Sequence, residues 1–150
     1  MSESTPFALL DNASARPWSE VPEWPVAEFV SATAAELDRG ARLCSWFGIR
    51  EGETVRLVAA LAFDADSTLA VGRSGPFERG YPSLTARHPQ AHLFEREVLE
   101  QCGVVPEGHP WLKPVRLDSG PGPAVFPFFR VEGREVHEVA VGPVHAGIIE

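Results

Sequence analysis

The sequence has few cysteines and few basic residues, and each shortage excludes a class of protein. Its two cysteines, Cys44 and Cys102, are too few and too far apart for a disulfide framework or for paired metal ligands. Thirteen Lys and Arg residues against 21 Asp and Glu give a net charge of -8, which argues against a nucleic-acid surface. No apolar run approaches the ~20 residues needed to cross a bilayer, and no secretory signal opens the chain. These absences predict a cytoplasmic globular protein.

The first part of the chain predicts an arm followed by a helix. Residues 1–24 are rich in proline and polar residues, which is typical of a mobile N-terminal arm. From Val26 to about Arg39 apolar residues recur at three- and four-residue steps, which predicts an amphipathic helix. Pro25 suits the start of this helix and Gly40 its end.

Strand patterns follow the first helix. Residues 54–63 alternate apolar and small residues with period two, and a turn at 50–53 predicts a hairpin with the residues before it. Residues 68–72 predict a third strand of an antiparallel meander, and residues 81–86 a short fourth strand. One apolar face of this sheet then needs a helical cover.

A second helix is predicted from about residue 90 to Cys102, where Gly103 ends it. Its expected buried stripe consists of Ala91, Phe94, Val98 and Cys102, with Leu99 beside it. Together the patterns predict an α+β fold: a two-layer domain whose mainly antiparallel sheet is covered on one face by two helices. An extended proline- and glycine-rich C-terminal tail follows, in which residues 124–133 and 134–150 predict one hairpin.

Few residues offer catalytic or metal-binding chemistry. His88, His92 and Glu95 loosely resemble a metal-binding pattern, and a small stand-alone metal-dependent enzyme that uses them is the alternative hypothesis. His88, however, precedes a proline, which disfavours helical dihedrals and spoils the alignment. Both cysteines are expected in the core, and the glycines at 72, 75 and 80 lack the context of a phosphate loop. We therefore expect no metal and no cofactor in this chain.

Three consecutive charged residues, Glu95, Arg96 and Glu97, lie on the second predicted helix. On a helix they point about 100° apart, so at least one should turn toward the protein. An exposed face, with Arg96 paired to Glu100, is the simpler interpretation. The sharper prediction is that Arg96 or Glu97 reaches the loop around His109, which has backbone groups to satisfy.

One stretch of the chain resembles a known family. The residues that carry the resemblance are Pro82-Ser83-Leu84-Thr85, Ala91, Glu95-Arg96-Glu97, Gly103 and Gly108-His109-Pro110-x-Leu112-Lys113. Their order and spacing resemble the C-type (thirty-kilodalton) subunit of NADH:quinone oxidoreductase, which assigns residues 25–117 to such a domain. One departure is Gln101-Cys102 after Glu100, where the family usually carries two large apolar residues.

The end of the chain carries a second resemblance. Residues 141–150 are similar to the opening of the large subunit of formate hydrogenlyase-type nickel-iron hydrogenases, in which a C-type domain is fused ahead of the large subunit. Residues 118–150 are then an extended tail and the start of the large-subunit region. The Cys-x-x-Cys pairs that hold nickel and iron in that subunit do not occur here, so the chain is expected to be an N-terminal domain of a longer protein.

The resemblance implies a non-catalytic assembly and docking domain that holds no cofactor. Its expected partners are the hydrogenase large subunit, or its complex I equivalent, and an iron-sulfur subunit, with association to the inner face of the membrane only through them. The expected docking or structural residues are Glu95, Arg96, Glu97, Gly108, His109, Pro110 and Lys113. Related complex I subunits place a histidine of a Gly-Pro-x-His segment near the quinone, which implies a role for His145 in the intact complex only.

Overall fold

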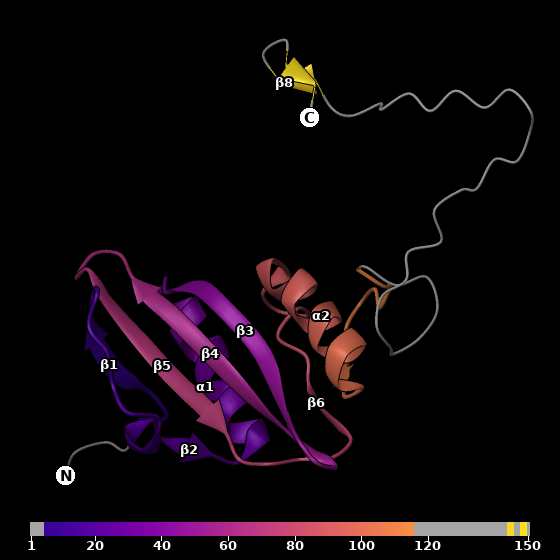
Figure 1. Cartoon of the computed structure of the whole chain (residues 1–150), viewed down its shortest axis with the longest axis horizontal. Coiled ribbons are helices and arrows are strands. Elements are labelled where there is room, and N and C mark those ends of the chain that lie inside the picture. Colours follow the sequence, from indigo (N-terminus) through magenta and orange to yellow (C-terminus); the bar gives the residue numbers. More distant parts are fainter. Residues whose placement is uncertain (1–4, 116–143, 146–147, 150) are drawn as a thin grey trace, which may run out of the picture.

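The centre of the fold is a five-stranded, mainly antiparallel sheet, drawn in Figure 1. The structure, a computed structural model, describes residues 5–115, 144–145 and 148–149. Strands β3 (Arg42–Glu51), β4 (Thr54–Phe63) and β5 (Thr68–Ser74) form the predicted antiparallel meander. The sheet order is β1-β5-β4-β3, and β2 also pairs with β5. The predicted hairpin turn is confirmed, with Gly52 at its tip at a φ of 63° that favours glycine.

The first residues that the structure describes are not a mobile arm, so that prediction is wrong for residues 5–24. Strand β1 (Ala8–Asp11) pairs antiparallel with β5, and β2 (Glu23–Trp24) pairs parallel with the same strand further along. A 3-10 turn, η1 (Trp18–Glu20), lies between them. The apolar side chains of Phe7 and Val21 are buried, and their burial explains why a polar, proline-rich stretch is held to the sheet.

Both helices cover the same face of the sheet, as predicted. Helix α1 (Val26–Asp38) places Phe29 on Trp46 of β3, with the two rings stacked 5.6 Å apart. Helix α2 (His92–Cys102) lies against Gly48, two residues further on the same side of β3. A Cβ on Gly48 would stand 2.7 Å from the Cys102 sulfur, so a side chain there would push α2 away. Figure 1 shows α2 beside β3.

Aromatic rings join the layers of the core. Phe29 contacts Phe7 at 5.9 Å, and Trp46 contacts Tyr81 at 6.1 Å, so the N-terminal segment, α1, β3 and β6 share one aromatic cluster. Gly72 of β5 lies beneath it, where a Cβ would come within 2.9 Å of the Phe29 ring. Ring contacts of this kind add to the free energy gained from burial.

The predicted fourth strand is shorter than expected and belongs elsewhere. Strand β6 covers only Gly80–Pro82 and pairs in parallel with β7 (Val105–Glu107), outside the main sheet. Residues 83–86 lie outside the strand, and the backbone N–H groups of Leu84 and Thr85 bond to a helix side chain, described below. A second 3-10 turn, η2 (Pro89–Ala91), leads into α2, and Gly103 ends α2 at a φ of 70°.

Two side chains in these elements are less buried than the sequence predicted. Cys44 is exposed and not in the core, because a β-bulge between Leu43 and Ser45 turns it outward. Phe94 is only partly buried against the core, whereas the predicted burial of Ala91, Val98 and Cys102 is confirmed.

Most of the C-terminal tail lies outside the described residues. Its backbone is described at β8 (Val144–His145) and β9 (Ile148–Ile149), which pair antiparallel. The hairpin predicted between 124–133 and 134–150 and the side chain of His145 both lie outside the described part. No helix in the described ranges is long and apolar enough to cross a membrane.

Candidate functional site

The family-motif residues meet where α2 passes the loop after β6. Glu95, in the first turn of α2, has no exposed surface. Its Oε2 accepts hydrogen bonds from Ser83 Oγ at 2.6 Å, Thr85 N at 3.0 Å and Thr85 Oγ1 at 2.5 Å. Its Oε1 accepts one from Leu84 N at 2.9 Å. A buried carboxylate is tolerated only when its oxygens are hydrogen-bonded in this way, so Glu95 fastens residues 83–85 to α2.

The Glu95 contacts show what sequence reasoning missed. The charged trio predicted that one residue would turn inward, but the expectation favoured Arg96 or Glu97. The deepest residue is Glu95, and the Ser83-Leu84-Thr85 segment supplies its donors. The Ser83-Leu84-Thr85 segment, whose hydroxyl and backbone N–H groups can donate to one carboxylate, is the signal that could have identified Glu95.

Arg96, the next residue of α2, holds the chain after β7. Its side chain is 7% exposed, its Nε donates to the Lys113 carbonyl at 2.5 Å, and its Nη2 donates to the Pro114 carbonyl at 2.7 Å. The guanidinium also lies 4.8 Å from the centre of the Trp111 ring. Arg96 thus forms a fork on two backbone carbonyls, a geometry that suits guanidinium.

The target of Arg96 differs slightly from the prediction. It reaches residues 111–114, a few positions beyond the Gly108-His109-Pro110 loop. Glu97 accepts a hydrogen bond from Gln101 Nε2, one turn further along the same helix. Glu100 Oε2 accepts a hydrogen bond from Val115 N at 2.7 Å, so it also holds the segment after β7.

The loop itself is organised by short-range bonds. His109 Nδ1 accepts a hydrogen bond from Trp111 N at 3.0 Å, which agrees with a structural role. Gly108 has a φ of 81°, a backbone conformation that favours glycine, and Pro110 is exposed. The Lys113 Nζ lies 5.3 Å from the Trp111 ring. Residues 109–115, which we call the 109–115 segment, run along α2 from Arg96 to Glu100.

His88, His92 and Glu95 do not form a metal site. His88 is not helical, with φ -124° and ψ 87°, as its position before Pro89 predicted. Its Nε2 lies 3.4 Å from Asp38 Oδ1 of α1, while the Glu95 carboxylate accepts hydrogen bonds from other residues. Within the described residues, no group of three His, Cys, Asp or Glu is placed to bind a metal ion.

Two buried titratable groups lie close to this region. Burial raises the pKa of the Tyr81 phenol above its ordinary value of 10.0, and the charge of Glu95 adds to this shift. Burial also raises the pKa of the Cys102 thiol, which disfavours the reactive thiolate. Both groups are therefore neutral at physiological pH and behave as core residues.

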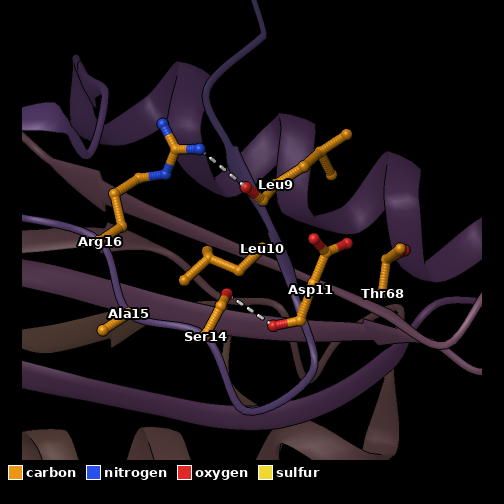
Figure 2. A pocket seen from close by; sticks show the side chains of 7 residues that line it. All are labelled: Leu9, Leu10, Asp11, Ser14, Ala15, Arg16 and Thr68. Atoms are coloured by element: carbon orange, nitrogen blue, oxygen red, sulfur yellow. Dashed lines mark hydrogen bonds between the residues drawn. The ribbon is translucent and has the colours of Figure 1, made fainter.

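Two surface hollows lie away from the motif residues. Figure 2 shows one at the end of β1, which is lined by Leu9, Leu10, Asp11, Ser14, Ala15, Arg16 and Thr68. Its polar groups bond to nearby backbone, since Arg16 Nη2 donates to Leu9 O at 3.2 Å and Ser14 Oγ to Asp11 O at 2.7 Å. A neighbouring hollow contains the Arg42–Asp64 ion pair. Neither hollow is lined by a family-motif residue.

The fold and these contacts define an α+β domain whose buried charged residues fasten its own loops. Residues 22–129 match the family described as the respiratory-chain NADH dehydrogenase 30 Kd subunit. Because this match covers well over half of the sequence, the chain belongs to that family.

Two curated relatives match a shorter stretch, and both are the C subunit of an NADH-quinone oxidoreductase. The relative from Dinoroseobacter shibae is 44% identical over 39 residues, which are 26% of this chain and 18% of the relative. The relative from Ruegeria pomeroyi is 46% identical over 39 residues, 26% of this chain and 20% of the relative. The matched stretch therefore spans about a fifth of each relative's length.

Proposed function

We propose that the chain is a non-catalytic assembly and docking domain of a complex I-related oxidoreductase. This proposal rests on what the motif residues Glu95 and Arg96 contact in the structure. Glu95 and Arg96 are buried and hydrogen-bonded to loop residues of the same chain, so both hold the fold together. Family membership then directs the proposal toward a respiratory-type complex.

The proposed partners are the large subunit that carries the catalytic centre and an iron-sulfur subunit. The similarity of residues 141–150 to a hydrogenase large subunit favours a formate hydrogenlyase-type complex, with the chain placed at the inner face of the membrane through its partners. The sequence encoded after Glu150 tests this link. A Cys-x-x-Cys pair in the following residues supports a hydrogenase, and its absence there argues for a separate subunit.

Co-purification tests the docking role. The 150-residue chain, tagged and produced as a separate polypeptide in the cells that encode it, should bring down the large and iron-sulfur subunits in defined stoichiometry, identified by mass spectrometry. Deletion of its gene segment should lower the amount of assembled complex on a native gel. Recovery of the chain free of both subunits, with the complex intact in the deletion strain, would contradict the proposal.

We further propose that the chain holds no metal or cofactor of its own. Elemental analysis of the purified chain tests this directly, because stoichiometric zinc, iron or nickel would favour the alternative enzyme. His145 is proposed to act near the quinone in the intact complex only. His145→Gln should then lower quinone-linked turnover while the assembled complex stays at its normal amount.

A further inference from the structure

Large apolar side chains are exposed around the 109–115 segment. Trp111 is 54% exposed, and Leu112 and Val115 follow in the same segment at 40% and 38%. Leu93 of α2 is 51% exposed and lies three residues before Arg96, hence on the side of the helix along which the segment runs. Clustered exposed apolar residues of this kind mark interaction surfaces more often than scattered ones do.

The exposed tryptophan is held in a fixed position. Its ring has the Arg96 guanidinium at 4.8 Å and the Lys113 ammonium at 5.3 Å, and its backbone N donates to His109 Nδ1. Arg96 also fixes the carbonyls of Lys113 and Pro114, and Glu100 fixes Val115 N. The segment has no regular secondary structure, so these side-chain bonds supply its rigidity. A rigid aromatic loses little entropy when it binds, which is why preorganised Trp residues dominate many interfaces.

The charge around the ring indicates the chemistry of the partner. Lys113 is the single lysine in a chain of net charge -8, and it lies exposed beside Trp111. Lys113 and Arg96 bring positive charge to the Trp111 side of this surface, and the Glu100 carboxylate lies at Val115. A complementary surface would offer an apolar pocket for the indole with a carboxylate near Lys113.

We infer that the surface made by Leu93, Trp111, Leu112, Lys113 and Val115 is the docking site for a partner subunit that presents an apolar pocket with an acidic rim. In this arrangement Arg96 and Glu100 are positioning residues, because they bind the backbone of residues 113–115. The inference rests on the proposed docking function and adds to it the contact surface and the chemistry of the partner.

The experiment compares two tryptophans that are both exposed and both lie next to an arginine guanidinium. Trp18 is 44% exposed and lies 4.6 Å from the Arg73 guanidinium, but it belongs to η1 and pairs with a β5 residue. The tagged 150-residue chain, produced as a separate polypeptide, would be isolated from its own cells as wild type, Trp111→Ala, Leu112→Ser and Trp18→Ala. Mass spectrometry would measure how much large subunit is recovered with each, and thermal melts would verify folding.

We expect Trp111→Ala to lower recovery of the large subunit by about tenfold or more, and Trp18→Ala to leave it unchanged. Leu112→Ser, at a position with no cation contact, should also lower recovery and covers the case in which Trp111→Ala fails to fold. Lys113→Glu should lower recovery more than Lys113→Met, because only the former repels a carboxylate.

Other outcomes overturn the inference. Wild-type recovery with both Trp111→Ala and Leu112→Ser would exclude this surface while leaving the docking function intact. Failure of the wild-type chain to bring down the large subunit would instead contradict the proposed function. If light scattering finds that the wild-type chain alone is a dimer and that Trp111→Ala makes it a monomer, the occupant is a second copy and the inference is wrong.

Discussion

Glu95 and Arg96 are neighbours in sequence, but their charges hold different parts of the chain. Glu95 accepts four hydrogen bonds from residues 83–85, and Arg96 donates two to residues 113 and 114. One helix turn thereby fixes the loop before α2 and the segment after β7. The two residues should respond to substitution through different contacts.

Replacing Glu95 should cost more than replacing any exposed acid. Glu95→Ala leaves the N–H groups of Leu84 and Thr85 and two hydroxyls without their buried acceptor, and we expect a loss of about 3 kcal/mol or more in the free energy of unfolding. Urea melts measure this loss. Glu28→Ala, exposed in the first turn of α1, is the matched control and should lose less than about 1 kcal/mol. Equal losses would mean that the Glu95 hydrogen bonds add nothing.

Tyr81 provides a spectroscopic test, because it is the single tyrosine. Burial raises the pKa of the folded phenol above the value of 10.0 that applies to the unfolded chain. The neutral phenol therefore contributes stability that is fully present below pH 10 and is lost as the pH rises beyond it. The tyrosinate absorbance should appear at about pH 10 in urea, but in the native protein only together with the loss of near-ultraviolet circular dichroism. A native titration at pH 10 without unfolding would place the phenol in water.

At the scale of the element, the two helices contribute to the core in different ways. Phe29 of α1 has no exposed surface and touches two aromatic rings, whereas Phe94 of α2 is only partly buried. Helix α2 directs Glu95 and Val98 inward, with Cys102 beside Gly48. The spacing of apolar residues therefore predicted this helix correctly, but it predicted more burial for Phe94 than the structure shows.

We expect Phe29→Ala to cost about 3–5 kcal/mol, as for other fully buried phenylalanines, and Phe94→Ala only about 1–2 kcal/mol. Urea denaturation of both variants gives the comparison. A larger loss at Phe94 than at Phe29 would show that α2, and not α1, closes the core.

Arg96 tests whether α2 holds the 109–115 segment. Arg96→Ala removes two hydrogen bonds and a ring contact, and should cost about 1.5–3 kcal/mol. Arg96→Lys keeps the charge but loses the fork, so it should restore only a small part of this loss. Glu100 is unsuitable as an inert control because it binds Val115 N. Arg39→Ala, an exposed pair with Glu36, serves instead and should lose little.

At the scale of the whole molecule, sequence periodicity accounts for the helices, the meander and the covered face. Period-two and three-to-four-residue patterns report burial on one side, as in both helices, β3 and β5, whereas β4 also buries Val58 and Ala62 on its other side. The same patterns do not report β1, β2 and β7, which are two to four residues long and pair with distant residues. The contacts of Arg96 also escape the sequence, because their partners lie 17 and 18 positions away on irregular chain.

The N-terminal strands should be essential to the whole domain. Removing residues 1–24 exposes the outer edge of β5 and deletes the buried Phe7 and Val21, so the truncated chain should unfold at lower urea and aggregate. A mobile arm would leave stability unchanged. Leu9→Ala, 60% exposed on β1, is the control for a mild change in the same strand. An unchanged melt of the truncated chain would contradict the role of β1 and β2.

The pairing of β1 with β5 also sets an order of events during synthesis. Ala8 and Asp11 must wait for Val71 and Thr68, which leave the ribosome roughly sixty residues later. At about 5–20 residues per second this delay lasts about 3–12 s. During that time the edge strand has no partner, and Phe7 and Val21 have no core to enter. The β1 segment therefore cannot reach its folded position before β5 has been synthesised.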